Sequence, residues 1–269
     1  MTFHTIGTDT EVFAVDEDGE HVALCGLIGG TKENPMQIEG LPPGFAFQED
    51  NVSLEWNIPP AQTLTEFQSS IKTINREVYH TLRHLGLKIS TEVGVSFSKH
   101  QLTHPKALEF GCEPDYNAWK MIENERPQAK DASLRTAGGH IHVGTDMEMV
   151  QGVQLMDLYL GIPSVILDNN EPSKKRRELY GKAGAMRPKP YGFEYRVLSN
   201  FWVFNPQYVD WVFNTVKRIC QGSANQKISN AHGKLIEECI NTQDTQKAKE
   251  IIQYFSIFMP NPLKIDNGW

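Results

Sequence analysis

GTDTEVFAV, residues 7–15, sets Asp9 and Glu11 two residues apart and then becomes continuously apolar. This pattern predicts a strand over residues 3–15. Because side chains alternate across a strand, Asp9 and Glu11 should project from the same face. Two carboxylates on one face repel each other unless a cation or an arginine lies between them. A solvent-exposed strand face is the alternative, but the apolar run after Glu11 favours a buried strand and a functional pair.

Two later segments repeat this spacing with other polar groups. GGHIHVG, residues 138–144, sets His140 and His142 on one face between glycines, and GFEYR, which ends at Arg196, does the same with Glu194. A single strand histidine is usually structural, but a pair between glycines is more often a ligand or phosphate-contact pair. Without a third histidine or a cysteine nearby, a tetrahedral zinc site is not favoured. Three such strands side by side would present the carboxylate, imidazole and guanidinium groups that Mg²⁺ and a triphosphate require.

A further acidic group lies within residues 45–58, which suit strands. Glu55 precedes Trp56 in a segment that otherwise resembles core, so its carboxylate needs a metal, an arginine or hydrogen bonds to offset its desolvation. Glu49 shares strand parity with Glu55 if the strand is regular, which makes Glu49 the preferred partner. Asp50 remains the alternative partner.

The composition indicates a globular protein whose ligand is held by local cations. The chain has 269 residues, of which 39% are hydrophobic and 10% aromatic, enough to fill a core. A net charge of −7 and a pI near 5.7 argue against nucleic acid or an anionic membrane as a partner. The four cysteines are widely spaced and form no CxxC pair: Cys25, Cys112, Cys220 and Cys239. Reduced thiols, with no signal-peptide or membrane-span pattern, predict a cytoplasmic protein.

The periodicity predicts one α+β domain over residues 1–269, with strands in the first half and helices at the end. Residues 64–85 give the strongest helical pattern, which should end at Gly86. Residues 98–134 form a long polar excursion, and residues 169–191 form a basic loop punctuated by glycine and proline. The remaining expected elements are strands near 21–25, 45–58 and 87–95 and helices near 147–167, 206–220, 229–241 and 244–258.

Arginines in and after the basic loop are candidates for binding phosphate or carboxylate. Arg177 and Arg187 lie in the loop, and Arg196 shares strand parity with Glu194. Arginine makes bidentate contacts with phosphate that lysine cannot supply. The chain lacks the P-loop pattern GxxxxGK[ST], a GxGxxG after a strand and a GxSxG nucleophile elbow. P-loop and Rossmann nucleotide binding and serine hydrolase chemistry are therefore not supported.

Four segments, in this order, resemble the glutamine synthetase-like carboxylate–amine ligases. They are GTDTEVF, FAFQEDNVSLEWN, GGHIHVG and YGKAGAMRPKPYGFEYR, which span about residues 5–200. Within that superfamily the chain is most similar to the phage-encoded carboxylate–amine (COOH–NH2) ligase type 2 group. The resemblance implies a curved, mainly antiparallel sheet with helices packed on its outer face, followed by C-terminal helices at about 206–258. It also implies a single catalytic domain that, if phage-encoded, acts in the cytoplasm of the host bacterium.

The resemblance further implies a cofactor set and a role for each motif residue. ATP would bind above two or three Mg²⁺ ions, with Mn²⁺ as an alternative metal. The implied metal ligands are Asp9, Glu11, Glu55 together with Glu49 or Asp50, His140 and Glu194. The implied nucleotide contacts are His142, Arg135, Lys182 and Arg196. The arginines implied to hold the transferring phosphoryl group are Arg187, Arg196 and Arg177.

The predicted reaction is ATP-dependent formation of an amide through an acyl phosphate. The substrates would be small-molecule or peptide carboxylates and amines, whose identity the sequence leaves open, together with the general base and the oligomeric state. The 98–134 excursion and the 169–191 loop are the expected lids that exclude water. One alternative is a metal-dependent hydrolase that uses the same Asp/Glu/His cluster. Another is a non-catalytic phage structural protein that retains the fold.

Overall fold

The fold is organised around one long central strand. The computed structural model describes residues 2–108, 115–125, 131–224 and 226–262. Strand β1, Phe3–Val15, pairs with β11, Gly139–Thr145, on one side and with β5, Ser53–Asn57, on the other. The sheet has the order β3-β4-β5-β1-β11-β13-β12-β8-β9, and β2 and β6 pair with the end of β1. These pairings are all antiparallel, which confirms the predicted α+β class with a mainly antiparallel sheet.

The other strands are shorter than β1. In the large sheet they are β2 (His21–Val22), β3 (Met36–Gln37), β4 (Ala46–Asp50), β6 (Lys88–Ser90), β8 (Tyr116–Asn117), β9 (Ile122–Glu123), β12 (Ala185–Lys189) and β13 (Gly192–Tyr195). A separate pair joins β7 (Gly94–Ser96) to β10 (Leu134–Thr136). The strand expected near 87–95 is therefore divided between two sheets.

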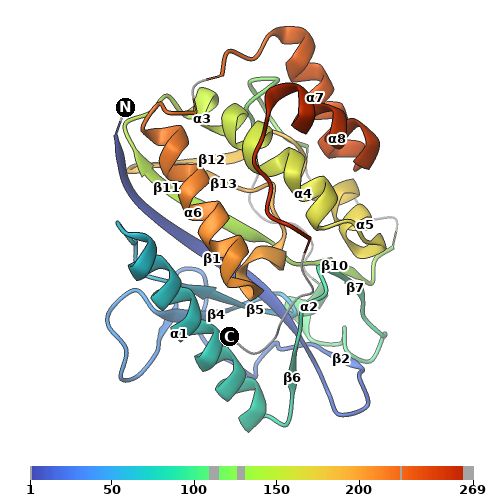
Figure 1. Ribbon diagram of the computed structural model, residues 1–269. Coiled ribbons are helices and arrows are strands. Elements are labelled where there is room, and N and C mark those ends of the chain that lie inside the picture. The colour runs from blue at the N-terminus through green and yellow to red at the C-terminus, as the bar shows by residue number, and fades with distance from the viewer. Residues whose placement is uncertain (1, 109–114, 126–130, 225, 263–269) are drawn as a thin grey trace.

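Most of the helices cover one face of the large sheet, whereas α2 (Pro105–Leu108) lies apart from this layer (Figure 1). The other helices are α1 (Leu64–His84), α3 (Met149–Met156), α4 (Ile162–Leu167), α5 (Glu171–Leu179), α6 (Pro206–Cys220), α7 (Asn230–Thr242) and α8 (Thr245–Phe255). A 3₁₀ turn at Asn200–Phe204 precedes α6. Of these, α2 is a single short turn in the excursion, whereas α6, α7 and α8 confirm the predicted helical C-terminus.

The main core lies between the helices and the sheet. Alternate residues of β1, among them Ile6 and Val12, belong to the same buried apolar cluster as Phe67 of α1 and Trp202 before α6. The intervening β1 residues project from the other face of the sheet, because side chains alternate along a strand. We call that other face, opposite the main helical layer, the site face.

Helix α1 shows why local sequence and packing agree. Thr63 and Glu66 form a reciprocal capping box at its start, which satisfies backbone N–H groups of the first turn. Its buried residues recur at helical spacing: Phe67, Ile71, Ile74, Val78 and Leu82. Gly86 follows with a φ of 74°, which confirms the predicted stop.

The helix expected at 147–167 is present with a π turn at Asp157–Gly161 between α3 and α4. Pro163 has no backbone N–H, so a regular hydrogen bond to the preceding turn is lost here. The combined segment Met149–Leu167 is long and apolar enough to cross a membrane, but 67% of its most apolar window is buried inside the protein. Such burial is typical of a core helix, and it is compatible with the predicted cytoplasmic location.

The predicted basic loop at 169–191 is wrong, because most of it is regular structure. Asn170 caps α5 by accepting a hydrogen bond from the backbone N–H of Ser173. Pro172 falls in the first turn of α5, where a missing N–H costs nothing. After this helix the chain forms β12, so Arg187 lies on a strand. Lysine, arginine and proline therefore suggested a loop where a capped helix and a strand form.

The excursion at 98–134 is mainly irregular, as predicted, in the part that the structure describes. A small second core underlies it, in which Phe13 and Val52 pack with Val95, Phe97 and Ala107. This core lies beside the site face, since Phe13 has the same strand parity as Asp9 and Glu11. Cys112 falls outside the described residues, and the other three cysteines are free thiols.

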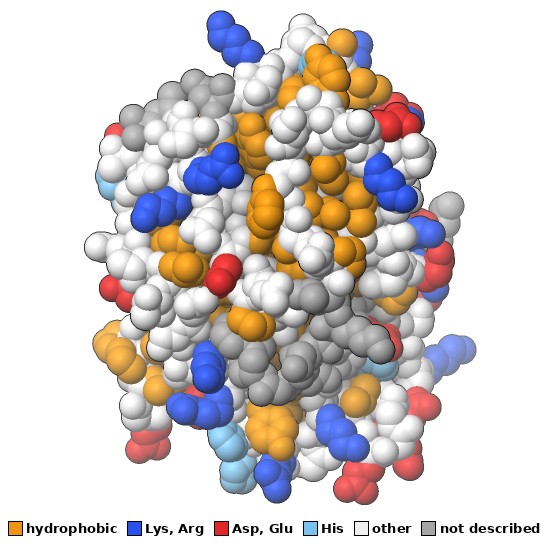
Figure 2. Space-filling view, viewed as in Figure 1, with side chains coloured by type: hydrophobic (Ala, Val, Ile, Leu, Met, Phe, Trp, Pro, Cys, Tyr) orange, Lys and Arg blue, Asp and Glu red, His pale blue; other side chains and the backbone are white. Residues whose placement is uncertain are grey.

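The outer surface of the helical layer carries exposed apolar groups. Figure 2 shows hydrophobic side chains gathered over the region of α7 and α8. Large exposed members include Leu235 of α7, Tyr254 of α8 and Phe258 just beyond it. This surface is separated from the site face by the thickness of the sheet and the helices.

Candidate active site

The strand register aligns the predicted polar residues across the site face. The facing pairs are Asp9–His140, Glu11–Glu55, His142–Glu194 and Glu194–Arg187. Residues that face each other across an antiparallel pair have closely spaced side chains. Groups that are far apart in the sequence are therefore neighbours on one surface, as strand alternation predicted.

Gly138 brings the first and third motifs together. Its backbone N–H donates a hydrogen bond of 2.7 Å to Oε2 of Glu11, and its carbonyl accepts one from the Glu11 backbone. A Cβ atom at this position would lie 2.4 Å from Nε2 of His140. The missing side chain thus makes the space in which the imidazole of His140 lies, as the flanking glycines suggested.

Glu11, Asp50 and Glu55 form the acidic cluster, in which one ligand atom from each lies within 4.8 Å of the others. Burial, reinforced by the charge of Asp50, raises the pKa of Glu11 to about 8. Burial, followed by the charge of Asp9, raises the pKa of Glu55 well above its usual range. Burial also raises the pKa of Asp50, although part of this residue is open to solvent. A divalent cation would reverse these shifts, since an opposite charge favours the ionised carboxylates.

Asp50 completes this cluster, and the expected pairing of Glu49 with Glu55 is wrong. In the β4–β5 hairpin, Gln48 faces Glu55 and Glu49 faces the core residue Leu54. Parity along the chain failed because the hairpin turn comes between the two glutamates. Beyond the turn, residues that face each other across the pair share a side.

The carboxylate of Glu49 instead fixes a neighbouring loop. It accepts hydrogen bonds of 3.1 and 2.8 Å from the backbone N–H groups of Ile28 and Gly29. Lys106 lies 3.4 Å from its other oxygen. These contacts give Glu49 a structural role on the side away from the acidic cluster.

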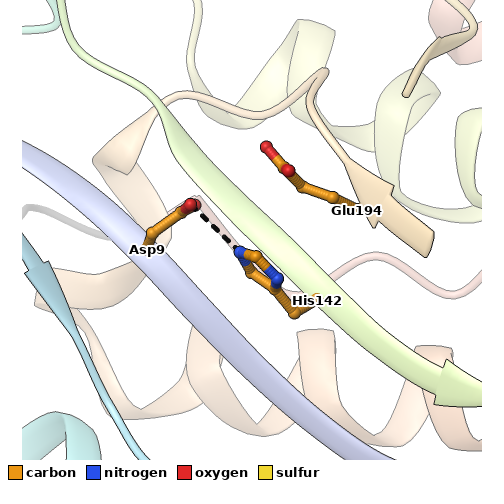
Figure 3. A group of neighbouring side chains, drawn as sticks. All are labelled: Asp9, His142 and Glu194. Carbon is orange, nitrogen blue, oxygen red and sulfur yellow. Dashed lines mark ion pairs between the residues drawn. The ribbon is translucent and has the colours of Figure 1, made fainter. Parts of the chain in front are cut away.

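The second group that could hold a metal ion consists of Asp9, His142 and Glu194 (Figure 3). Oδ2 of Asp9 lies 3.0 Å from Nε2 of His142, and Oδ1 lies 3.1 Å from Nδ1 of His140. Burial would raise the pKa of Asp9, but the two imidazoles outweigh it and hold that pKa well below its usual range. With Arg196 included, we call these five residues the mixed cluster.

The pKa values of the two histidines of the mixed cluster shift in opposite directions. Burial, with the charge of Arg196, lowers the pKa of His140, so its neutral imidazole is suited to metal ligation. Burial also acts against protonation of His142, but the carboxylate of Asp9 outweighs it and raises the pKa. The Nδ1 atom of His142 is hydrogen-bonded to the hydroxyl of Tyr191. When protonated, His142 could contact an anion, whereas its neutral imidazole could ligate a metal together with Asp9 and Glu194.

Glu194 is a buried carboxylate surrounded by cations. Arg196 contacts its Oε1, Nζ of Lys189 lies 2.9 Å from Oε2, and Arg187 approaches to 3.9 Å. Burial and Asp9 act to raise the pKa of Glu194, but Arg196 and the two histidines lower it to about 2. Lys189 was not predicted here, although it has the same parity as Arg187 on β12.

Arg177 does not reach the site face, so its predicted phosphate contact is not supported by its position. Its guanidinium donates to the carbonyl of Gly181 and to the hydroxyl of Ser164, within the helical layer. The adjacent Arg176 lies on the side of the site instead, and it donates to the carbonyls of Val197 and Leu198. Arg176, rather than Arg177, lies on the side of the site because both are on helix α5, where neighbouring residues point about 100° apart.

Arg135 and Lys182 were predicted to contact the nucleotide, and the structure gives each a different environment. Arg135 is buried, and its guanidinium donates to the carbonyls of Ala132, Leu134 and Ala107. It therefore holds the excursion against the site. Lys182 is exposed, and it does not line the cleft described below.

A cleft that is partly open to solvent lies beside the acidic cluster, and its empty space, with the open solvent at its mouth included, is roughly 850 Å³. Glu11, Asp50, His140, Arg176 and Arg196 line its polar side. Residues of the second core and of the excursion line its other side. The cleft and the mixed cluster meet at His140 and Arg196, so a ligand in the cleft would lie next to both clusters.

These groups suit a hard divalent cation and a phosphate. Carboxylate oxygens with one imidazole are ligands for Mg²⁺ or Mn²⁺, and the cations around Glu194 could contact phosphate oxygens. Sequence reasoning named Asp50 only as the alternative to Glu49, and it missed Arg176 and Lys189 as members of the site. The two-residue turn after Asp50 could have decided for Asp50, and the helix cap at Asn170 could have indicated Arg176.

Comparison with known protein families agrees with this chemistry. Residues 129–255 match the family model described as phage phiEco32-like COOH.NH2 ligase-type 2. The match confirms the resemblance to carboxylate–amine ligases and supports an enzyme that forms C–N bonds. The matched segment, just under half of the chain, contains the histidines and arginines of the site, whereas the acidic cluster and Asp9 lie before it. No curated protein matches the chain.

Proposed function

We propose that this protein is an ATP-dependent carboxylate–amine ligase that forms an amide through an acyl phosphate. The observation that carries the proposal is the placement of the acidic cluster and the mixed cluster on one sheet face, joined at His140 and Arg196. Transfer of a γ-phosphoryl group needs carboxylates that bind a metal cation, and it needs arginines beside them that can contact phosphate.

Two groups of residues would hold the metal ions of the reaction. Glu11, Asp50 and Glu55 supply one set of oxygen ligands, and Asp9, Glu194 and a histidine supply the other. When bound, the metal ions would neutralise charge on the phosphate oxygens. The raised pKa values of the acidic cluster support this fit, because a bound cation would favour the ionised carboxylates.

The basic residues would act on the phosphoryl group and on water access. Arg187, Lys189 and Arg196 would contact the γ-phosphate while the substrate carboxylate oxygen attacks phosphorus and the bond to ADP breaks. The amine nitrogen then attacks the carbonyl carbon, inorganic phosphate leaves and the amine loses a proton. Arg196 also contacts Asp115 of the excursion, so it would link phosphate binding to the wall of the cleft.

Coupled product analysis tests the proposal directly. The purified chain is incubated with ATP, Mg²⁺ and pools of amino acids and cell-wall peptides, and both ADP and product masses are measured. We expect ADP release in equal amount to a new amide, and a hydroxamate when hydroxylamine replaces the amine. Amide formation without ATP, or ester or amide hydrolysis that needs metal but no nucleotide, would contradict the proposal and favour a hydrolase.

A matched pair of arginine variants locates the chemistry. Arg187→Gln should lower kcat by roughly 10³-fold, the scale of an arginine that stabilises a transferring phosphoryl group. Arg83→Gln removes an exposed arginine of α1 and should leave kcat unchanged. Equal activity of the two variants would exclude Arg187 from phosphoryl transfer.

A further inference from the structure

The cleft has an apolar wall that phosphoryl transfer does not use. Phe13 and Val52 of the second core, Leu134 of β10 and Leu179 of α5 line it, and Phe13 lies next to Glu11 on the same face of β1. Neither a metal ion nor a phosphate gains from such a surface. A wall of this kind favours a ligand with a carbon body that can be removed from water.

The cations of the cleft are largely engaged by the protein itself. Arg135 donates to three backbone carbonyls and to the side chain of Asn51. Arg176 donates to two further carbonyls. Arg196 contacts Glu194 and Asp115. The arginines of the cleft are therefore already hydrogen-bonded within the protein, and a cationic group that binds Asp115 would share this carboxylate with Arg196.

Asp115 is the carboxylate of the cleft that stands apart from both metal-binding groups among the described residues. One oxygen accepts a hydrogen bond of 2.8 Å from the side chain of Asn124, and the other lies 3.3 Å from Nε of Arg196. Its side chain remains 19% exposed. Among the contacts of the described residues, each oxygen thus keeps a lone pair for one more donor, and Arg196 places that donor beside the phosphoryl-transfer groups.

We propose that the cleft binds the amine substrate as an organic primary ammonium, with Asp115 as its anchor and the apolar wall as the surface for its carbon body. This inference rests on the proposed ligase function, because only that reaction uses an amine as a substrate. It specifies a substrate class, because free ammonia would leave the apolar wall without a contact. Asp115 acts here in recognition, by hydrogen bonding and charge, rather than as a group that removes the proton.

A binding experiment tests the inference without requiring turnover. Saturation-transfer NMR, in saturating Mg²⁺, compares n-butylammonium with 1-butanol, which has the same shape and no charge. We expect n-butylammonium to bind the native chain about tenfold or more tightly than 1-butanol, the effect of one charge-assisted hydrogen bond. Asp115→Asn should abolish this preference, and Asp115→Glu should retain most of it.

A matched control separates the anchor from general charge effects. Asp131 belongs to the same excursion and is exposed, and in the contacts described its carboxylate bonds only to Ser96 and Ser133, outside the cleft. Asp131→Asn should therefore keep the native preference for n-butylammonium. Thermal unfolding of each variant verifies that it is folded. An unchanged preference in folded Asp115→Asn, or its loss in Asp50→Asn alone, would overturn the inference.

An activity experiment distinguishes failure of this inference from failure of the proposed function. In Asp115→Asn, the KM for an alkylamine should rise about tenfold, a larger change than in the KM for ATP or in the capture of the acyl phosphate by neutral hydroxylamine. Butylammonium binding with no ATP-dependent product would refute the ligase function but keep the cleft as an ammonium site. Hydroxylamine capture with no effect of Asp115→Asn on KM for the alkylamine would refute the anchor and keep the ligase.

Discussion

The acidic cluster and the mixed cluster lie on the same sheet face, yet they manage buried charge in opposite ways. In the mixed cluster, imidazoles, Arg196 and Lys189 surround the carboxylates and lower the pKa values of Asp9 and Glu194. In the acidic cluster, carboxylates face carboxylates and their pKa values rise. The mixed cluster is compensated by the protein, whereas the acidic cluster gains most from a cation that binds to it.

The largest effect on stability is expected from a substitution that disrupts the mixed cluster. Glu194→Gln removes the negative charge between Arg196 and Lys189 and leaves buried positive charge unpaired. We expect the free energy of unfolding to fall by about 3–5 kcal/mol, the usual cost of breaking a buried ion pair. Urea denaturation measures this change. Glu178→Gln, at an exposed position on α5, should change stability by less than about 0.5 kcal/mol.

The acidic cluster and the mixed cluster should also change stability in opposite directions as the pH changes. Glu11 has a pKa of about 8 when folded, against about 4.3 when unfolded. Between these values the folded chain keeps a proton that the unfolded chain has lost, so stability should fall as pH rises, by up to about 1.4 kcal/mol per unit. Glu194, with a pKa of about 2, acts in the opposite direction and loses its contribution as pH falls below about 4.

Thermal unfolding across pH 5–8 without divalent cations checks this prediction. Glu11→Gln should flatten the decrease because its side chain does not titrate. A native chain whose stability is constant over this range would show that Glu11 ionises normally in the fold.

Removing one charge from the acidic cluster should be stabilising. Glu55→Gln keeps an oxygen that can accept the hydrogen bond from Gln48 and removes repulsion from Glu11 and Asp50. Without divalent cations at pH 8, we expect the free energy of unfolding to increase, because a buried carboxyl group whose ionisation is unfavourable is replaced by a neutral amide. Glu49→Gln is the matched control with the opposite sign, because Glu49 is paired with Lys106.

Magnesium should make the native chain more stable than Glu55→Gln, which reverses the order of stability expected without divalent cations. At a concentration 100 times its Kd, Mg²⁺ would stabilise the native chain by about 2.7 kcal/mol. Glu55→Gln should gain much less, since one oxygen ligand has lost its charge. Equal stabilisation of both by Mg²⁺ would place the metal outside the acidic cluster.

The smallest effect concerns the edge of the mixed cluster. Tyr191→Phe removes the hydroxyl bonded to Nδ1 of His142 and keeps the aromatic ring beside the imidazole. We expect a loss of about 0.5–1 kcal/mol, as for one partly exposed hydrogen bond. NMR titration of His142 should show its pKa changing by less than in Asp9→Asn, because the Asp9 carboxylate makes the largest contribution that raises it.

The sequence predicted the parts of the site that depend on alternation within a strand. Asp9 with Glu11, His140 with His142 and Glu194 with Arg196 each share a face because side-chain direction repeats every two residues. The central strand β1 and helix α1 followed from equally local patterns. In these elements the packing of the folded chain reinforces the local preference.

The errors arose where the direction of a side chain depends on a turn or a cap. Glu49 was preferred to Asp50 because strand parity was extended across a hairpin. Arg177 was preferred to Arg176 because α5 was interpreted as a loop, in which neighbouring residues have no fixed direction. Asp115 and Lys189 reach the site through tertiary contacts with Arg196 and Glu194, which no local pattern encodes.

The short turn after Asp50 has a consequence for how such a site can change over time. Lengthening or shortening that connection by one residue, with the β5 strand held in place, would rotate every β4 side chain to the opposite side of the pleat. Glu49 would then point toward Glu55, and Asp50 would turn toward the loop that contains Gly29. A single insertion or deletion could thus replace a short aspartate ligand with a longer glutamate and change the size of the metal site, although no acidic residue is substituted.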